Sequence, residues 1–120
     1  DGIVIMSHKV FQMPFSQIYS LLLQKALKKG RSQEEVDTVI QWLTGYSQDQ
    51  IHAMLETPID YEHFFLQAPS LNEKRFLIKG SICGVKLETI EDPMMQNIRY
   101  LDKLIDELAK GKSLDKILRK

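Results

Sequence analysis

Apolar residues recur every three or four positions in three stretches of the chain, the spacing that places them on one face of an α-helix. The first stretch begins at Pro14, a residue suited to the first turn of a helix, and runs to Lys29. The second covers residues 33–44 and the third covers residues 93–110. Their apolar positions are Phe15, Ile18, Tyr19, Leu22, Leu23, Ala26 and Leu27, then Val36, Val39, Ile40 and Leu43, then Met94, Ile98, Leu101, Ile105 and Leu108. The pattern predicts three amphipathic helices.

Capping residues mark the ends of these helices. Ser32 with Glu35, and Ser47 with Gln50, have the spacing of the capping box, in which each side chain satisfies a free backbone N–H group of the other residue. Gly45 is suited to end a helix in the left-handed conformation. We therefore predict a helix that stops at Gly45, a tight turn, and a shorter helix that follows Ser47 at a large angle.

The region before the third long helix is compatible with two structures. One is a β-hairpin in which residues 75–79 pair with residues 82–87 about the two-residue turn Gly80-Ser81. The other is a capped helical turn over residues 72–79. Earlier in the chain, Asp60 is placed to cap a further short helix.

The N-terminal residues are interpreted separately. Residues 7–13 alternate weakly between apolar and polar, which favours a short strand or an extended lead-in. Met6 is a natural start, so residues 1–5 are interpreted as a tag remnant or a misassigned start. We expect one domain over residues 6–120 that is mainly α, a compact bundle of five or six helices, with the hairpin around residues 75–87 left open.

Charge and hydropathy bound the possible partners. Sixteen basic and sixteen acidic residues cancel, so no net field attracts nucleic acid or an acidic surface. The basic cluster of Lys25, Lys28, Lys29 and Arg31 lies at a predicted helix C-terminus, where the helix dipole favours cations. No apolar run approaches the ~20 residues that span a bilayer. We expect a cytoplasmic protein without a nucleic-acid or membrane partner.

Metal-binding residues lack the spacing of a metal site. The candidates are Asp60, Glu62, His52 and His63. Glu62 and His63 are adjacent, and neighbours in a helix point ~100° apart, so they do not converge on one ion. Exposed helix histidines are the favoured interpretation, and we expect neither a metal nor another cofactor.

Catalytic residues are equally weakly indicated. Cys83, the single cysteine, lies in a glycine-rich stretch, residues 80–84, that matches neither a nucleophile elbow nor a phosphate-binding loop. Asp102 and Asp106 share a helix face at i, i+4, but basic residues surround them, which is typical of a mixed-charge solvated face. We expect no catalytic residue and lean against an enzyme.

Aromatic residues give the remaining candidate site. Trp42, Tyr46 and Tyr61, with Cys83 and Tyr100, are interpreted either as core or as the lining of a small-molecule pocket or partner surface. In a small domain such aromatic side chains are mostly core.

Specific short motifs are distributed over nearly the whole chain after Met6. They include Trp-Leu-Thr-Gly-Tyr and Asp-Tyr-Glu-His-Phe-Phe, and they lie at residues 28–31, 36–37, 42–46, 60–65, 68–69, 82–85, 90–93, 98–104 and 106–112. This set resembles the bacterial family of uncharacterised proteins known as domain of unknown function 2200 (DUF2200). The resemblance implies one complete bacterial domain, and it brings no established activity, substrate, cofactor or functional residue.

Two hypotheses for function follow. The first is a non-enzymatic cytoplasmic module that binds a second copy of itself or another protein through the helix over residues 93–110, whose apolar positions step by 4, 3, 4 and 3. The alternative is a small-molecule-binding protein or enzyme with a pocket near Tyr46, Tyr61, Cys83 and Tyr100.

Overall fold

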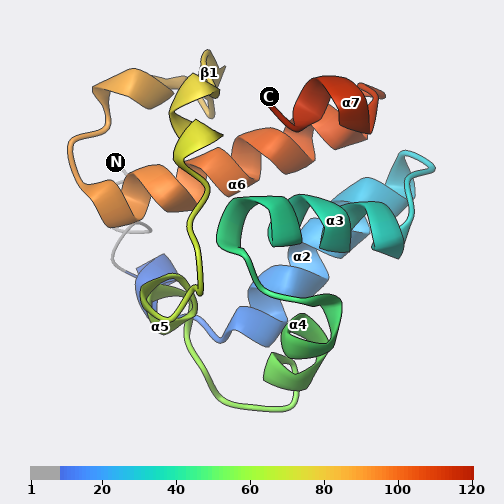
Figure 1. Cartoon of the computed structure of the whole chain (residues 1–120), viewed down its shortest axis with the longest axis vertical. Coiled ribbons are helices and arrows are strands. Elements are labelled where there is room, and N and C mark those ends of the chain that lie inside the picture. The colour runs from blue at the N-terminus through green and yellow to red at the C-terminus, as the bar shows by residue number, and fades with distance from the viewer. Residues whose placement is uncertain (1–8) are drawn as a thin grey trace.

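The computed structural model describes residues 9–120, so the predictions about residues 1–5, about Met6 and about the first part of the lead-in fall outside it. The described part of the chain is built mainly from helices (Figure 1). In chain order its elements are α2 (Phe15–Lys28), α3 (Gln33–Thr44), α4 (Gln48–Met54), α5 (Tyr61–Leu66), the 3-10 helix η1 (Glu73–Leu77), β1 (Ser81–Ile82), β2 (Val85–Lys86), the 3-10 helix η2 (Leu87–Thr89), α6 (Pro93–Ala109) and α7 (Leu114–Ile117). The predicted mainly α fold is confirmed.

The chain before Pro14 is helical at residues 9–12, so the predicted strand or extended lead-in is wrong there. This helical segment stops because a residue that precedes proline is driven out of the α region. Pro14 then forms an isolated antiparallel bridge with Asp60, and the Tyr61 N–H donates to the Met13 carbonyl at 2.9 Å. These contacts fasten the beginning of α2 to the beginning of α5.

The predicted caps are present at the predicted residues. The Ser32 and Ser47 side chains accept hydrogen bonds from the backbone N–H groups of Glu35 and Gln50, and both capping boxes are complete. Asp60 caps α5 in the same way, through the N–H of His63. Side chains close in sequence therefore determine where α3, α4 and α5 begin.

Gly45 ends α3 at a corner where the chain returns over the helix end. Its φ of 82° is left-handed, which an L side chain rarely adopts. The Ser70 N–H donates to the Thr44 carbonyl at 3.0 Å, and the Asn72 N–H donates to the Leu43 carbonyl at 2.9 Å. A Cβ atom at Gly45 would lie 2.9 Å from the Ser70 nitrogen. Both the backbone angle and the close approach therefore require glycine.

The hairpin forms, but about a different turn from the one predicted. Ser81 pairs with Lys86 and Ile82 with Val85, so the two central turn residues are Cys83 and Gly84. Both have positive φ, 53° and 80°, as a tight hairpin turn requires. The predicted strand at residues 75–79 is wrong, because η1, capped by the Asn72 side chain, occupies that segment and bears out the alternative of a capped helical turn.

The apolar face of α6 lies inside the molecule. Ile98, Leu101, Ile105 and Leu108 are at most 1% exposed, and α6 packs against α2 and α3. In Figure 1, α6 runs across the molecule, with α2 and α3 on one side and the hairpin and α7 on the other. The apolar face of α6, which the sequence suggested as a surface for self-association, is therefore covered by other parts of the same chain.

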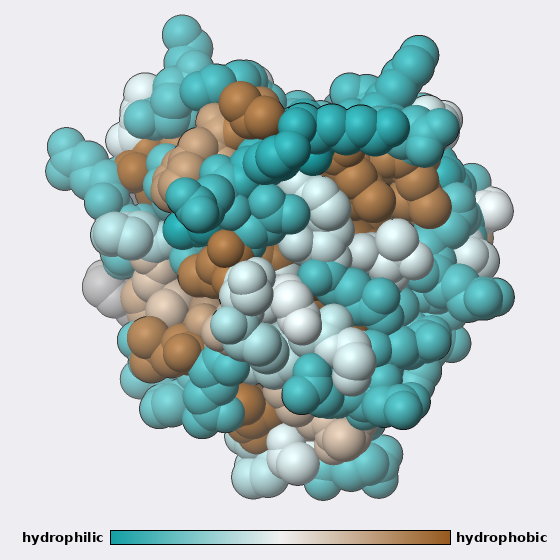
Figure 2. Space-filling view, in the orientation of Figure 1, coloured by the Kyte–Doolittle hydropathy of each residue, from teal (hydrophilic) through white to brown (hydrophobic). Residues whose placement is uncertain are grey.

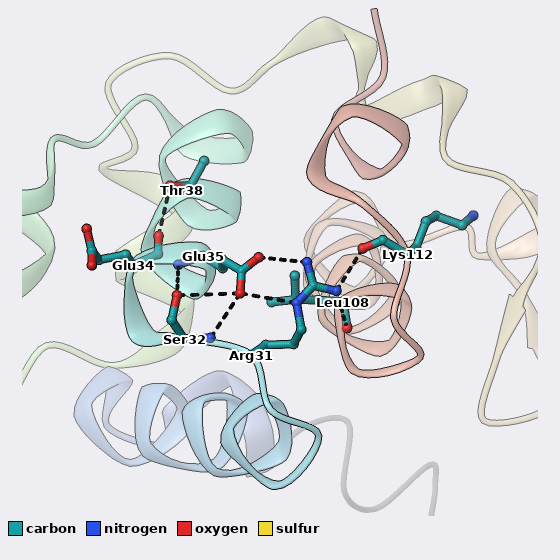
Figure 3. A network of polar contacts seen from close by, with 7 residues as sticks. All are labelled: Arg31, Ser32, Glu34, Glu35, Thr38, Leu108 and Lys112. Atoms are coloured by element: carbon teal, nitrogen blue, oxygen red, sulfur yellow. Dashed lines mark hydrogen bonds and ion pairs between the residues drawn. The ribbon is translucent and has the colours of Figure 1, made fainter.

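Arg31 joins the corner between α2 and α3 to the end of α6 (Figure 3). Its guanidinium donates to the Leu108 carbonyl in the last turn of α6 at 2.9 Å and to the Lys112 carbonyl just beyond that helix at 2.8 Å. The same guanidinium holds both carboxylate oxygens of Glu35, at 3.1 Å and 2.7 Å. These hydrogen bonds from Arg31, together with the Ser32 N–H, lower the pKa of Glu35 to about 2.

The surface mixes hydrophobic and hydrophilic side chains. In the view of Figure 2, hydrophobic atoms form small patches separated by hydrophilic ones. The large apolar side chains that are about half exposed or more include Leu21, Leu27, Leu66, Phe76 and Leu77. Within residues 9–120, no helix combines the length and the apolar character needed to cross a membrane.

Candidate functional site

An aromatic cluster connects α2, α5 and the α3–α4 corner. The Phe64 ring stacks on Phe15, with centroids 4.0 Å apart, and on Tyr46 at 5.1 Å. Tyr61 lies 6.0 Å from the Phe64 ring and 5.2 Å from the Phe65 ring. Tyr46 and Tyr61 thus share one apolar environment, but their hydroxyl groups differ in hydrogen bonding.

The Tyr46 hydroxyl donates to the Phe64 carbonyl at 2.7 Å. The Tyr61 hydroxyl is buried and has no hydrogen-bond partner among residues 9–120. The Tyr61 side chain is only 1% exposed, and this burial, with the nearby Asp102 carboxylate, raises its pKa far above the usual value. The hydroxyl is therefore a protonated donor without an acceptor in the described part of the chain.

Tyr61 lines a cavity of about 280 Å³ between α2, the start of α5, α6 and residues 9–13, which we call the Tyr61 pocket. Its apolar lining consists of Val10, Met13, Ile18, Leu21, Leu22 and Ile98. Its polar lining consists of Lys9, Tyr61, Arg99 and Asp102. A mostly apolar wall with a few polar groups is the composition of small-molecule sites, whose volumes begin at roughly 300 Å³.

Arg99 and Asp102 form an ion pair in this wall. The Arg99 Nη1 atom lies 3.0 Å from Asp102 Oδ2, and the two side chains are 20% and 28% exposed. Burial raises the pKa of Asp102, although Arg99 opposes the shift. A guanidinium has five N–H donors, and in the described part of the chain Arg99 uses one of them. Arg99 and Tyr61 therefore both line the pocket, and each has hydrogen-bond donors without an acceptor among residues 9–120.

The other residues of the predicted aromatic site lie elsewhere. Trp42 is half-buried at a separate open hollow beside Gly45 and residues 70–74. Cys83 is exposed in the hairpin turn. Tyr100 is buried, with its ring edge-on to Phe76 at 6.3 Å. Of the five candidates, Tyr61 alone lines the Tyr61 pocket, and Tyr46 contacts the Phe64 ring, which in turn contacts the Tyr61 ring.

The acidic candidates on α6 have the basic partners expected from the sequence, but they do not form a solvated face. Asp106 pairs with Lys25 at 3.2 Å and with Lys110 at 3.0 Å, and its side chain is only 15% exposed. Lys25 comes from α2, which packs over this face of α6. The i, i+4 spacing indicated that the Asp106 carboxylate is exposed, but the packing of α2 on α6 buries it. Helical spacing within α6 does not reveal this packing.

Each of the two histidines within residues 9–120 contacts a single carboxylate. His63 Nδ1 lies 2.7 Å from Asp60 Oδ1, and His52 Nε2 lies 2.9 Å from Asp37 Oδ2. Within residues 9–120, no three or more histidine, cysteine, aspartate or glutamate side chains are grouped so that they could hold a metal ion.

Asp37 is a buried polar residue that no sequence motif marks as a candidate. Its carboxylate is 1% exposed and accepts hydrogen bonds from the Tyr19 hydroxyl at 2.6 Å and from the Gln48 amide at 3.0 Å, besides its contact with His52. These partners join α2 to α4 across α3. The sequence could have indicated that Asp37 is buried, because Asp37 and Thr44 lie seven residues apart beside the apolar stripe of α3. It could not have indicated which side chains bind the Asp37 carboxylate.

The comparisons with known proteins agree with this architecture. A solved structure described as "Crystal structure of uncharacterized protein SP1917" is 45% identical, covers 92% of this chain and 90% of its own, and superposes with a TM-score of 0.88. No curated protein matches the chain. The model of a family described as "Uncharacterized protein conserved in bacteria (DUF2200)" matches residues 9–119. The chain therefore belongs to the DUF2200 family, as its motifs indicated.

Proposed function

We propose that the protein binds a small, mostly apolar molecule in the Tyr61 pocket and that the Tyr61 hydroxyl donates a hydrogen bond to it. The observation that carries this proposal is that hydroxyl, buried without a partner among the residues described. An unsatisfied buried donor costs about 1–3 kcal/mol and is rare in native proteins. A ligand with an acceptor atom removes this cost, and the apolar wall of the pocket accommodates the rest of the ligand.

An NMR titration of the whole chain with 1-octanol tests the proposal. We expect saturable shifts in residues of the pocket wall, with Ile18, Leu22 and Ile98 among them. Tyr61→Phe should weaken binding about fivefold, the net value of one neutral hydrogen bond. Tyr46→Phe is the matched control and should bind like the wild type, because the Tyr46 hydroxyl is already satisfied. Unsaturable shifts, or shifts at another face, would contradict the proposal.

The second candidate is the interaction module that the sequence favours, acting through self-association. Because the apolar face of α6 is enclosed, the surface would have to be another one. Phe76 and Leu77, adjacent in η1, are 50% and 52% exposed and offer such a surface. Light scattering should then give a dimer mass that Phe76→Ser converts to the monomer mass and that Leu27→Ser, on α2, does not. A monomer mass for the unaltered chain at high concentration would end this candidate.

A cytoplasmic setting is part of both candidates. The exposed free thiol of Cys83 supports it, because cysteines remain reduced in the cytosol and oxidise readily outside it. Fractionation of the expressing bacterium, with the protein followed by antibody, should recover it with the cytosol; recovery in a secreted fraction would contradict this part of the proposal.

A further inference from the structure

We infer that the ligand of the Tyr61 pocket is an aliphatic monocarboxylate, with its carboxylate on Arg99 and Tyr61 and its hydrocarbon chain against α2 and α6. The inference rests on the proposed function, because it specifies the ligand of the same pocket. It uses three properties of the pocket: its unused hydrogen-bond donors, its charge and its volume.

The unused donors favour an acceptor-only head group. The Tyr61 hydroxyl has no acceptor among residues 9–120, and the Arg99 guanidinium donates a single hydrogen bond, through Nη1. A carboxylate has two acceptor oxygens and no donor, and the fork of an arginine matches it in geometry. An alcohol head can accept from one of these donors, but its own hydroxyl hydrogen then needs an acceptor as well.

Charge in the wall favours an anion over a cation. Lys9 and Arg99 contribute two positive charges, and Asp102 contributes one negative charge. Asp102 Oδ2 already accepts from Arg99 Nη1, so the carboxylate of a ligand is expected on the remaining edge of the guanidinium. Lys25 of α2 also acts on Asp102 and offsets its repulsion of an anion. An ammonium head would instead meet Lys9 and Arg99.

The volume of the pocket limits the length of the chain. At about 30 Å³ for each water molecule in the liquid, 280 Å³ corresponds to about nine waters, so the pocket suits a ligand of about ten non-hydrogen atoms. Octanoate has about that size. The hydrocarbon chain would contact Ile18, Leu22 and Ile98, and Leu21 lies at the 52%-exposed edge of the same wall.

Three probes of one chain length, namely octanoate, 1-octanol and octylammonium, test this inference on the unaltered protein near neutral pH. Calorimetry or NMR titration should give octanoate an affinity at least about tenfold higher than that of 1-octanol, the factor expected of a charge-assisted hydrogen bond. Octylammonium should bind most weakly. Equal affinity of octanoate and 1-octanol, or a preference for octylammonium, would overturn the inference and leave the pocket a ligand site. Failure of all three to bind would overturn the proposed function as well.

Two substitutions locate the preference. Arg99→Gln should bring the ratio of the octanoate affinity to the 1-octanol affinity to about one, and the dispersion of its amide NMR spectrum shows that the variant is folded. Asp102→Asn removes the negative charge of the wall and should raise the affinity for octanoate. An octanoate preference that survives Arg99→Gln would overturn the assignment of the carboxylate to Arg99.

Discussion

Tyr61→Phe removes one oxygen atom and tests the Tyr61 pocket through stability as well as through binding. On folding, the Tyr61 hydroxyl loses its water and gains no partner among residues 9–120. Tyr46 is a matched control, because its hydroxyl is buried in the same aromatic cluster and donates to the Phe64 carbonyl. The two substitutions delete the same group from two sites that differ in one hydrogen bond.

The expected changes in the free energy of unfolding have opposite signs. Relief of an unsatisfied donor gains about 1–3 kcal/mol, and after the small void left by the oxygen we expect Tyr61→Phe to stabilise by about 1 kcal/mol. Tyr46→Phe loses a hydrogen bond and leaves the Phe64 carbonyl buried, which should destabilise by about 1–2 kcal/mol. The variants should therefore differ by about 2–3 kcal/mol, or about 10 °C in Tm.

Urea unfolding measures both variants through the fluorescence of Trp42, the single tryptophan, which is half-buried in the folded chain. Repeating the unfolding with 1-octanol should stabilise the wild type and Tyr46→Phe more than Tyr61→Phe, because only a ligand that binds the folded state raises its stability. If Tyr61→Phe destabilises the protein as much as Tyr46→Phe does, the Tyr61 hydroxyl has a partner in solution and the reasoning is refuted.

Two further predictions concern the fold. Gly45→Ala should destabilise by about 2–4 kcal/mol in the same unfolding assay, because the left-handed backbone and the contact with Ser70 both oppose a Cβ. Gly30→Ala should cost only about 1 kcal/mol, because Gly30 has a φ of 80° but no atom of residues 9–120 within 4 Å of the added Cβ. Equal losses would contradict the close approach at Gly45. Glu35 has a folded pKa of about 2, below the ~4.3 of an unfolded glutamate, so its ion pair with Arg31 stabilises fully above pH ~5 and is lost as the pH falls toward 2. Glu35→Gln should flatten the stability–pH curve in that window by about 1 kcal/mol, and an unchanged curve would argue against the pair.

The helix boundaries could be predicted because they depend on residues close in sequence. Ser32 and Glu35 satisfy each other within one turn, and Ser47 and Gln50 do the same, so these caps need no tertiary partner. The hairpin turn could not be placed, because a positive φ at Cys83 is not visible in its residue type. Gly80 is the residue type that favours a turn, but in the structure it lies directly before β1.

The candidate site could be predicted only in part. Tyr61 was identified as an aromatic candidate, but its partners in the wall were assigned to other roles. Asp102 was attributed to a solvated face of α6 because its helical neighbours are basic, and Leu21 falls just outside the apolar stripe of α2. Only the packing of α2 on α6 brings these side chains together with Arg99. Helical periodicity describes one face at a time and cannot show which two faces enclose a cavity.

The most direct test of the account is an isotope-filtered NOE measurement on the whole chain with octanoate. Octanoate in the Tyr61 pocket should give contacts from its alkyl protons to the side chains of Ile18, Leu22 and Ile98, and from the protons next to its carboxylate to the Tyr61 ring. Contacts confined to the exposed side chains Phe76 and Leu77, or no contacts at octanoate concentrations that saturate the chemical shifts, would contradict it.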